Sequence, residues 1–297
     1  MRYTNRNKYP FYVEEWLKRD DYDYEPNVLS ATRLLAPVRQ TILLERFGEY
    51  LETDVADAIA KRYGTAIHDS FERMRYEESH ENIVQEKRKY ANVSDQMISG
   101  KFDMIVRKDD TTWKIVDIKS TSVWTHIYES RLEDYRLQLS ILAYLLAENE
   151  YAVSPFGEIV YVFTDWKASD ARKSANYPSE RILVEEVELL SPEATHDWLV
   201  KRIGLIQHYR TVETDKLLDC PEDELWRDKT KWAVRKEGVE RAVRVFETEA
   251  EAEELLKTKD KRHYVEKRTG YVRRCKYCDA SNVCTQYKRM RDRGEVE

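Results

Sequence analysis

The sequence has 297 residues, of which 41% are hydrophobic and 36% charged, with a net charge of −6 at pH 7. This hydrophobic share supports a sizeable core, and twenty Tyr with seven Trp exclude an intrinsically disordered chain. The N-terminus lacks the apolar segment of a signal peptide, and the longest apolar run, residues 141–147, is too short to cross a bilayer. We therefore expect an intracellular, cytoplasmic protein without a membrane span.

Helices are expected in the first part of the chain. Residues 1–27 are polar and Tyr-rich without a clear hydrophobic period, and are predicted to form an N-terminal extension. A helix is expected over residues 31–52, with Ser30 as its N-cap and an interruption at Pro37. A further helix is expected to begin near Asp54, which is a plausible capping residue.

A histidine-bearing helix and a group of strands follow. Gly64 is expected to precede a helix on which His68 and Glu72, four residues apart, share one face. The residue patterns then predict strands over residues 83–90, 97–106, 113–119, 158–164 and 181–189, and helices over residues 132–149 and 191–211. Residues 28–219 are therefore predicted to form an α/β core, with a central mixed sheet flanked by helices.

The chain changes character after Cys220. Two short strand patterns flank a Glu-Gly hairpin signal, and a Thr-x-x-Glu capping box then opens a short helix. With a third strand expected over residues 264–267, the pattern predicts a small ββαβ insertion between Cys220 and Cys275. Residues 220–297 are therefore expected to form a C-terminal region of their own.

Two acidic residues and a lysine lie on strands around a short predicted turn. Asp103 ends a Gly-x-x-Asp pattern, and Asp117 and Lys119 form an Asp-x-Lys triplet in a largely apolar strand. A hairpin would bring the two carboxylates close together, and a divalent cation relieves the repulsion between them. Lys119 points to the same side of its strand as Asp117. Carboxylates, metal and lysine together can activate water and stabilise the charge that develops in phosphodiester hydrolysis.

Simpler interpretations remain open for each of these residues taken alone. Asp117 and Lys119 can form an ordinary ion pair within a hairpin. His68 can be a packed or surface histidine rather than a metal ligand. Glu72 is expected to be a solvated helix residue.

In order along the chain, the strings GTAIHDSFE, SGKFDMIV, WKIVDIKST and YRLQLSILAYLL resemble the RecB-type branch of the PD-(D/E)XK nucleases. That branch includes the RecB and AddB nuclease domains and the CRISPR-associated RecB-like exonucleases. The resemblance covers about residues 28–165 plus the C-terminal cysteines. It implies a restriction-endonuclease-like core and hydrolysis of DNA that depends on Mg²⁺ or Mn²⁺.

The resemblance also implies roles for single residues. The Mg²⁺ or Mn²⁺ ligands would be His68, Asp103 and Asp117, a set of oxygens and one imidazole that suits these cations. Lys119 would position the attacking water, and Gln138 matches a glutamine that reaches the active site or the DNA. The sequence departs from the family where a tyrosine usually follows four residues later, because Leu142 occupies that position. Gln138 can therefore also be a polar residue beside an apolar helix face.

Three cysteines lie close together near the C-terminus, as Cys275-x2-Cys278-x5-Cys284. In a reducing compartment this spacing indicates metal ligation, and Cys220 is the expected fourth ligand. The resemblance to cluster-bearing RecB-like nucleases implies a [4Fe–4S] cluster, although Ala36 replaces the N-terminal cysteine of that group. Four thiolates also suit Zn²⁺, and a site of three cysteines is a third possibility. In each case the metal is expected to fasten the C-terminal region to the core.

The segment of residues 261–293 is basic although the whole chain is acidic. It contains eleven Lys and Arg against three acidic residues. Contact with DNA is expected here, through Arg273, Arg274 and Lys276 in particular. A solvated surface face is the alternative interpretation.

The sequence thus predicts a metal-dependent DNA nuclease, an exonuclease of recombination, repair or phage DNA processing in a bacterial or phage-infected cell. It contains no G-x-x-x-x-G-K-[ST] motif, so a helicase or recombination partner would be a separate chain. The alternatives are a non-catalytic nucleic-acid-binding protein that keeps the fold, a zinc-bound scaffold protein, and an RNA nuclease.

Overall fold

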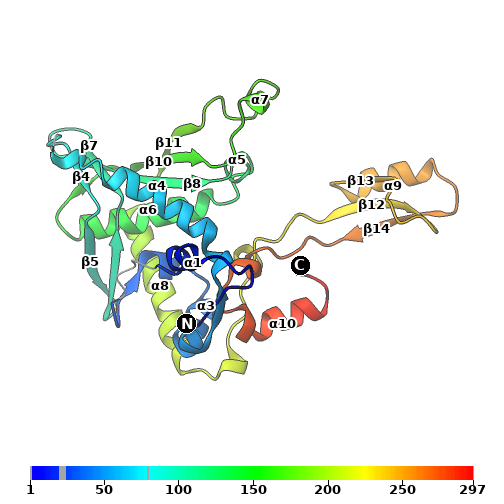
Figure 1. The fold of residues 1–297 in the computed structure, drawn as a ribbon, viewed down its shortest axis with the longest axis horizontal. Coiled ribbons are helices and arrows are strands. Elements are labelled where there is room, and N and C mark those ends of the chain that lie inside the picture. The colour runs from blue at the N-terminus through cyan, green and yellow to red at the C-terminus, as the bar shows by residue number, and fades with distance from the viewer. Residues whose placement is uncertain (1, 20–24, 79, 297) are drawn as a thin grey trace. The chain divides into compact units, whose positions relative to one another are not determined.

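The computed structural model describes residues 2–19, 25–78 and 80–296 (Figure 1). The chain forms two compact units. We call Met1–Ile42 with Glu52–Val212 the first unit, and Leu43–Leu51 with Glu213–Glu297 the second unit. The predicted boundaries at residues 27 and 219 remain predictions, and residues 1, 20–24, 79 and 297 of the predicted regions lie outside the described residues.

A mixed sheet forms the centre of the first unit. Its strands lie in the order β11-β10-β8-β7-β4, and β9 also pairs with β8. Their bounds are β4 (Ile83–Gln85), β7 (Met104–Arg107), β8 (Thr112–Thr121), β9 (Ala152–Val153), β10 (Phe156–Phe163) and β11 (Ile182–Glu188). β10 runs parallel to β8, whereas the β7–β8 and β10–β11 pairs are antiparallel. The predicted mixed α/β core is therefore confirmed.

Helices pack against this sheet (Figure 1), and apolar side chains of the sheet are buried. Both α4 (Ile59–Glu72) and α6 (Leu132–Ala147) contact β8, and α8 (Pro192–Thr211) packs on α6. Ile115, Leu139 and Ile159 are fully buried, because strand and helix contribute one apolar face each. Ser191, where a helix was predicted to begin, caps α8 by accepting a hydrogen bond from the Ala194 N–H.

Smaller elements complete the first unit. One small sheet has the order β2-β6-β5, and another pairs β1 with β3. The bounds are β1 (Arg2–Thr4), α1 (Phe11–Lys18), β2 (Leu29–Ser30), α2 (Ala31–Leu35), β3 (Glu52–Asp54), β5 (Arg88–Val93), β6 (Gln96–Lys101), α5 (Val123–Ile127) and α7 (Ala168–Ala171). Helix α3 (Val38–Phe47), whose residues are divided between the first and second units, begins after Pro37, so the predicted interruption there is confirmed.

Two predictions about local structure are wrong, each for a physical reason. Gly64 lies inside α4 rather than before it, because the helix passes close to β8: a Cβ at Gly64 would lie 3.1 Å from Ser120 Oγ. The single strands predicted over residues 83–90 and 97–106 are each divided between two sheets. Glu86, with φ at 51°, breaks the first, and the buried Phe102 lies at the break of the second.

The second unit contains a β-sheet module and a C-terminal helix. The module consists of β12 (Lys231–Lys236), β13 (Arg244–Phe246), α9 (Glu249–Lys257) and β14 (His263–Arg268), and the helix is α10 (Thr285–Asp292). The sheet order is β13-β12-β14, with both pairs antiparallel, and α9 packs on all three strands. The predicted hairpin is present, and Thr248 and Glu251 form the predicted capping box.

The two ends of this module lie side by side. The Asp228 N–H donates a hydrogen bond of 2.9 Å to the Tyr271 carbonyl, and Arg227 pairs with Val272. These two segments of the chain approach so closely that a Cβ at Gly270 would lie 1.8 Å from the Asp228 carbonyl oxygen. Position 270 therefore requires glycine.

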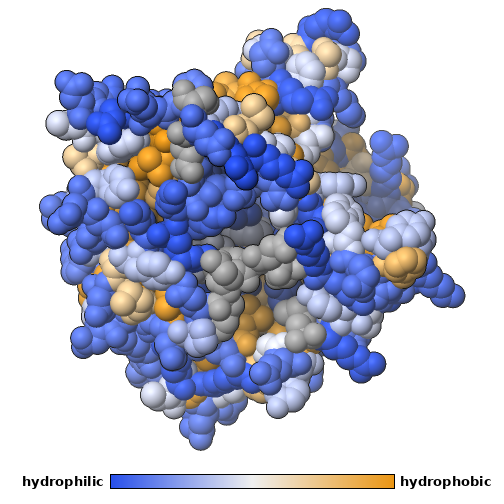
Figure 2. All heavy atoms as spheres, turned by 60° about the vertical axis from the view of Figure 1, so that its left-hand side comes forward, coloured by the Kyte–Doolittle hydropathy of each residue, from blue (hydrophilic) through white to orange (hydrophobic). Residues whose placement is uncertain are grey.

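Polar and charged side chains cover most of the face drawn in Figure 2, and smaller apolar patches lie between them. Among the described residues, none of the helices combines the length and apolar character needed to cross a membrane.

Candidate active site

β8 carries Asp117 and Lys119 into the interior of the first unit. Strand side chains alternate, so these two residues point to the same side. Asp117 is 2% exposed, and Lys119 Nζ lies 2.6 Å from Asp117 Oδ2. This contact is an ion pair without hydrogen-bond geometry, and within the described part of the chain Asp117 Oδ2 has no hydrogen-bond partner.

Asp103 meets the same strand from the bend between β6 and β7. Its Oδ2 accepts a hydrogen bond of 2.7 Å from the Ile118 N–H, which lies between Asp117 and Lys119 in the chain. The antiparallel pairing of β7 with β8 holds this bend beside β8. The two carboxylates therefore stand next to one another at the sheet.

His68 faces Asp103 from helix α4. Its Nδ1 lies 3.5 Å from Asp103 Oδ2, and its side chain remains about one third exposed. Glu72, one turn later on the same helix, is exposed and lies 3.9 Å from Lys101 Nζ. The structure thus brings His68 to the carboxylates, and places Glu72 at the surface as expected.

Helix α6 supplies two contacts to Lys119. Gln138 Oε1 accepts a hydrogen bond of 2.9 Å from Lys119 Nζ, and the Tyr135 ring centroid lies 5.1 Å from the same atom. Tyr135 is buried and stands one turn before Gln138. Gln138 was predicted from the sequence, whereas Tyr135 was not, although its spacing of three residues from Gln138 places it on the same helix face.

Burial and charge shift the pKa of each group in this cluster. Burial raises the pKa of Asp117, although the Lys119 charge opposes it. Burial also acts to raise the pKa of Asp103, but the hydrogen bond with His68 and the charges of His68 and Lys119 lower it overall. The hydrogen bond with Asp103 raises the pKa of His68. Burial acts to lower the pKa of Lys119, yet the charges of Asp117 and Asp103 raise it overall. Lys119 is therefore an ammonium that donates hydrogen bonds rather than a base.

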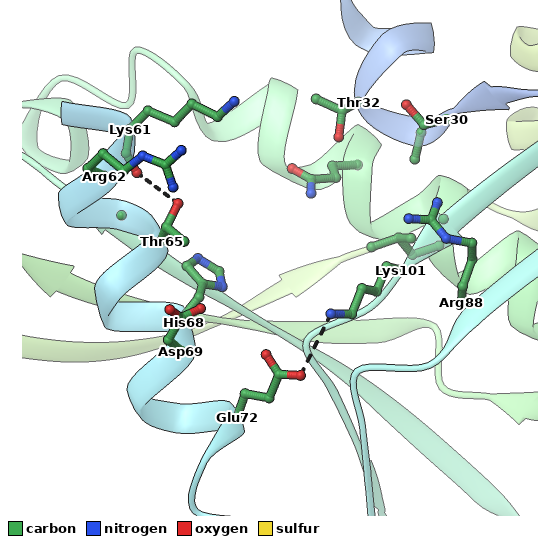
Figure 3. A pocket seen from close by; sticks show the side chains of 15 residues that line it. Ser30, Thr32, Lys61, Arg62, Thr65, His68, Asp69, Glu72, Arg88 and Lys101 are labelled. Atoms are coloured by element: carbon green, nitrogen blue, oxygen red, sulfur yellow. Dashed lines mark hydrogen bonds and ion pairs between the residues drawn. The ribbon is translucent and has the colours of Figure 1, made fainter. Parts of the chain in front are cut away.

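A cavity of about 510 Å³ opens beside this cluster (Figure 3). His68, Thr65 and Lys61 of α4 line one side, and Arg88 and Lys101 line the other. Gln138 also lines it, so the cavity reaches the residue that contacts Lys119. Its charged residues are four cations, Lys61, Arg62, Arg88 and Lys101, against two acids, Asp69 and Glu72. Such a balance suits an anionic ligand.

The chemistry of the donor set fits a hard divalent cation. Asp103 and Asp117 offer carboxylate oxygens, His68 offers an imidazole, and the buried Asp117 Oδ2 lacks a hydrogen bond. Over the described residues, no group of three or more His, Cys, Asp or Glu side chains has the arrangement of a metal site. Instead the carboxylates are paired with the side chains of Lys119 and His68.

The four cysteines all lie in the second unit and are half-buried. Cys220 and Cys275 pack against the same apolar cluster of Leu225, Val272 and Met290. Burial first, and then the neighbouring Cys278 and Cys284, raise the pKa of Cys275 to about 11. Burial raises the pKa of Cys278 to about 11 as well.

The buried side chain of Gln286, at the start of α10, fixes the backbone of Cys220 on both sides. Its Oε1 accepts a hydrogen bond of 2.8 Å from the Cys220 N–H, and its Nε2 donates one of 2.9 Å to the Cys220 carbonyl. This clamp joins two segments that are 66 residues apart in the sequence. Cys220 is thereby held at the base of the helix that follows Cys284.

The basic segment of residues 261–293 is less positive at its surface than its sequence implies. Several of its arginines form ion pairs with carboxylates: Arg262 with Asp260, Arg268 with Glu266, Arg273 with Asp228, Arg289 with Asp219, and Arg293 with Glu295. The Arg274 guanidinium lies 4.6 Å from the Trp226 ring. Two of the three residues expected to contact DNA, Arg273 and Arg274, therefore already make contacts within the second unit.

The chain is similar to a family of known proteins and, more weakly, to solved structures. Among solved structures, SSO0001 matches with a TM-score of 0.46 and 20% identity, covering 66% of this chain and 85% of its own. LHK-Exo, in a complex with dAMP, matches with a TM-score of 0.32 and 15% identity, covering 61% of this chain and 92% of its own. Curated proteins give no match. The model of the PD-(D/E)XK nuclease superfamily matches residues 16–285, which is most of the chain, and this protein therefore belongs to that superfamily.

Proposed function

We propose that the chain is a divalent-metal-dependent DNA exonuclease of the RecB-type branch, with its active site at His68, Asp103, Asp117, Lys119 and Gln138. Nuclease activity is the general property of the superfamily to which the chain belongs. The observation that carries the proposal is the pair of contacts that Lys119 makes. Its ammonium forms an ion pair with the buried Asp117 on β8 and donates a hydrogen bond to the Gln138 amide on α6. An ion pair that served only stability would not need the Gln138 contact or the adjacent anion-compatible cavity.

Three side chains would hold the metal: His68, Asp103 and Asp117. Bound there, Mg²⁺ or Mn²⁺ would supply Lewis acidity and lower the pKa of water near the scissile phosphate. Asp103 is already oriented by the Ile118 N–H, and His68 is directed at the same carboxylate. These second contacts fix the ligands in place before any substrate arrives.

Lys119 would act on the substrate as a fixed positive charge. Its raised pKa keeps the ammonium protonated, so it can orient the attacking water and neutralise the negative charge that grows on the phosphate. Gln138 and Tyr135 hold the ammonium from the side of α6. Loss of either contact would let the ammonium swing towards Asp117 alone.

The cationic cavity would bind the DNA backbone next to the cut. Lys61, Arg62, Arg88 and Lys101 surround a space that also borders His68 and Gln138. Phosphate groups pair with such cations, and their release of counterions makes binding dependent on salt. In the second unit, Lys276 with Arg273 and Arg274 would add weaker backbone contacts, and a separate helicase or recombination protein would deliver the strand.

We further propose that Cys220, Cys275, Cys278 and Cys284 ligate a [4Fe–4S] cluster, with the ββαβ module as an insertion between the first two ligands. The Gln286 clamp on Cys220 and the shared packing of Cys220 and Cys275 support the inclusion of the distant cysteine. Burial favours protonated thiols, so metal binding would have to release their protons. Such a cluster would be structural, because it would join segments far apart in the sequence.

Cleavage of end-labelled linear and circular DNA tests the nuclease proposal. Anaerobically purified protein should cut linear DNA with Mg²⁺ or Mn²⁺ but not with EDTA, and should spare circles. Lys119→Ala and the isosteric Asp103→Asn should abolish cutting. Lys114→Ala is the matched control, since Lys114 lies on the same strand but pairs with Glu158 and Glu186. Absence of cutting by folded wild-type protein with either metal would refute the proposal.

Metal analysis tests the cysteine proposal separately. Anaerobic protein should contain iron and sulfide with broad absorption in the visible range, and Cys220→Ser should lose most of both. Zinc without iron would replace the cluster by a zinc site. Iron that is retained fully in Cys220→Ser would exclude Cys220 as a ligand.

A further inference from the structure

Two exposed aromatic rings stand just beyond the strand that carries Lys119. Trp124 is 51% exposed and Tyr128 is 72% exposed, yet their rings are stacked, with centroids 5.9 Å apart and planes inclined by 22°. They lie four residues apart, at the start and just past the end of α5, so one helix turn presents both. Scattered exposed aromatics are ordinary, but a stacked exposed pair offers its outer ring faces to the planar groups of a ligand.

Contacts with Asp165 and Tyr177 hold helix α5 and its aromatic pair in place. Asp165 accepts hydrogen bonds from Ser122 Oγ at 2.6 Å and from the Val123 N–H at 2.8 Å, and Val123 is fully buried. The buried Tyr177 meets the Trp124 ring edge-on at 6.2 Å. Helix α5 is thus anchored at its first residues and beneath its aromatic side chain, which keeps the stacked pair in place.

Ring contacts also connect helix α5 to the active site. Tyr161 is paired in register with Lys119, and its ring lies 6.3 Å from that of Tyr135, which stands over the Lys119 ammonium. On α5, the His126 ring lies 5.0 Å from Tyr161. Helix α5 therefore packs on the strand residue next to Lys119.

The spacing suits a nucleic-acid strand. The chain is extended from Lys119 to Ser122, the N-cap of α5. At about 3.3 Å per residue, the length of this segment is roughly 10 Å. Stacked nucleotides rise about 3.4 Å each, so this span equals about three nucleotides. The segment that supports α5, residues 164–181 with the short helix α7, also exposes Lys167, Arg172 and Lys173, which can meet phosphates.

We propose that Trp124 and Tyr128 form a stacking platform for unpaired bases of the strand whose phosphate is cut at Lys119. This rests on the proposed nuclease function and names its substrate class: single-stranded DNA or a frayed strand end. Bases inside a duplex have both faces covered by their neighbours, whereas unpaired bases along a strand can offer a face to the pair. Stacking accepts every base, and the platform therefore predicts little sequence preference.

Binding in EDTA tests the platform without cleavage. Fluorescence anisotropy should measure the affinity of the whole protein for labelled oligothymidylate and for a duplex of equal length. Trp124→Ala and Tyr128→Ala should each weaken oligothymidylate binding by about fivefold to a hundredfold, because stacking contributes about 1–3 kcal/mol per base. Trp124→Phe should keep most of the affinity. Tyr50→Ala removes an aromatic side chain that is 82% exposed in the second unit, and should change nothing.

The outcomes separate the platform from the proposed function. Unchanged oligothymidylate affinity in both alanine variants would overturn the platform, as would an equal loss of duplex affinity. Tyr128→Ala guards against misfolding, because its side chain is mostly exposed, and equal melting temperatures confirm the fold. If Trp124→Ala loses single-strand affinity but the wild type cuts nothing with Mg²⁺ or Mn²⁺, the platform stands and the nuclease proposal fails.

Discussion

The Asp117–Lys119 pair makes a sharp prediction about stability. We expect Lys119→Ala to destabilise the protein strongly in metal-free buffer, because it leaves the Asp117 carboxylate buried without its cation. We expect the double variant Asp117→Asn/Lys119→Ala to recover much of that loss, because an amide has no charge to compensate. The two substitutions should therefore be strongly non-additive.

The geometry gives the size of the effect. Two unit charges 2.6 Å apart attract by about 6 kcal/mol at an effective dielectric constant of about 20, before the cost of desolvation. Removing one partner of a buried pair typically costs about 3–5 kcal/mol. Asp117 is 2% exposed, so water cannot easily replace the lost ammonium. The coupling energy between the two sites should lie between about 1.5 and 3 kcal/mol.

Urea unfolding of the wild type, both single variants and the double variant, all with EDTA, measures this coupling. Equal slopes of the four transitions would show that the unfolded states are comparable. If the two losses add to within about 0.5 kcal/mol, the ion pair does not compensate the buried charge, and the reasoning from burial is wrong.

Three further predictions concern other parts of the first unit. Asp54 accepts hydrogen bonds from Thr4, Arg6 and Ala56, and the Arg6 N–H above all lowers its pKa to about 2. The folded pKa of Asp54 lies below its unfolded value of about 3.9, so the ionised carboxylate stabilises the fold by roughly 2 kcal/mol above pH ~4. This stabilisation is lost as the pH falls to about 2. Asp54→Asn should therefore flatten that part of an acid-denaturation profile. Gly100→Ala should lower the melting temperature, since the added Cβ would lie 2.4 Å from Leu142 Cδ2 and overpacking costs about 1–3 kcal/mol. Gly204→Ala, in open space on α8, should instead raise it, and equal shifts would contradict the packing argument. Tyr135→Ala should lower kcat about tenfold with KM nearly unchanged, whereas Tyr135→Phe should keep wild-type activity, because the ring face rather than the hydroxyl stands over Lys119; a loss in Tyr135→Phe would assign the role to the hydroxyl.

Features that depend on short stretches of sequence were predictable. The caps at Ser30 and Ser191 and the capping box of Thr248 and Glu251 involve residues three apart, so their hydrogen bonds can be read from spacing alone. The burial of Asp117 followed from its apolar neighbours on β8. In each case the determining partners lie within one turn or one strand.

Features that depend on distant partners were not predictable in the same way. Gly64 marks a close approach of α4 to Ser120 on β8, whereas the sequence alone makes it look like a helix boundary. The division of residues 83–93 between two sheets depends on the positive φ of Glu86, and Glu carries no strong signal for that conformation. The pairing of Arg273 with Asp228 and of Arg289 with Asp219 spans 45 and 70 residues, so the basic segment looked more exposed than it is.

The joined ends of the β12–β14 module have a consequence for protein engineering. Antiparallel partners lie about 5 Å apart, so the chain enters and leaves the module at almost one point. A short turn that links Asp228 to Gly270 would bridge the same gap, and the module could be removed or exchanged as a cassette without lengthening the path between Cys220 and Cys275. The hairpin tip at Gly238, with φ at 73°, is equally suited to accept a fluorescent or affinity label, because its backbone already forms a tight exposed turn.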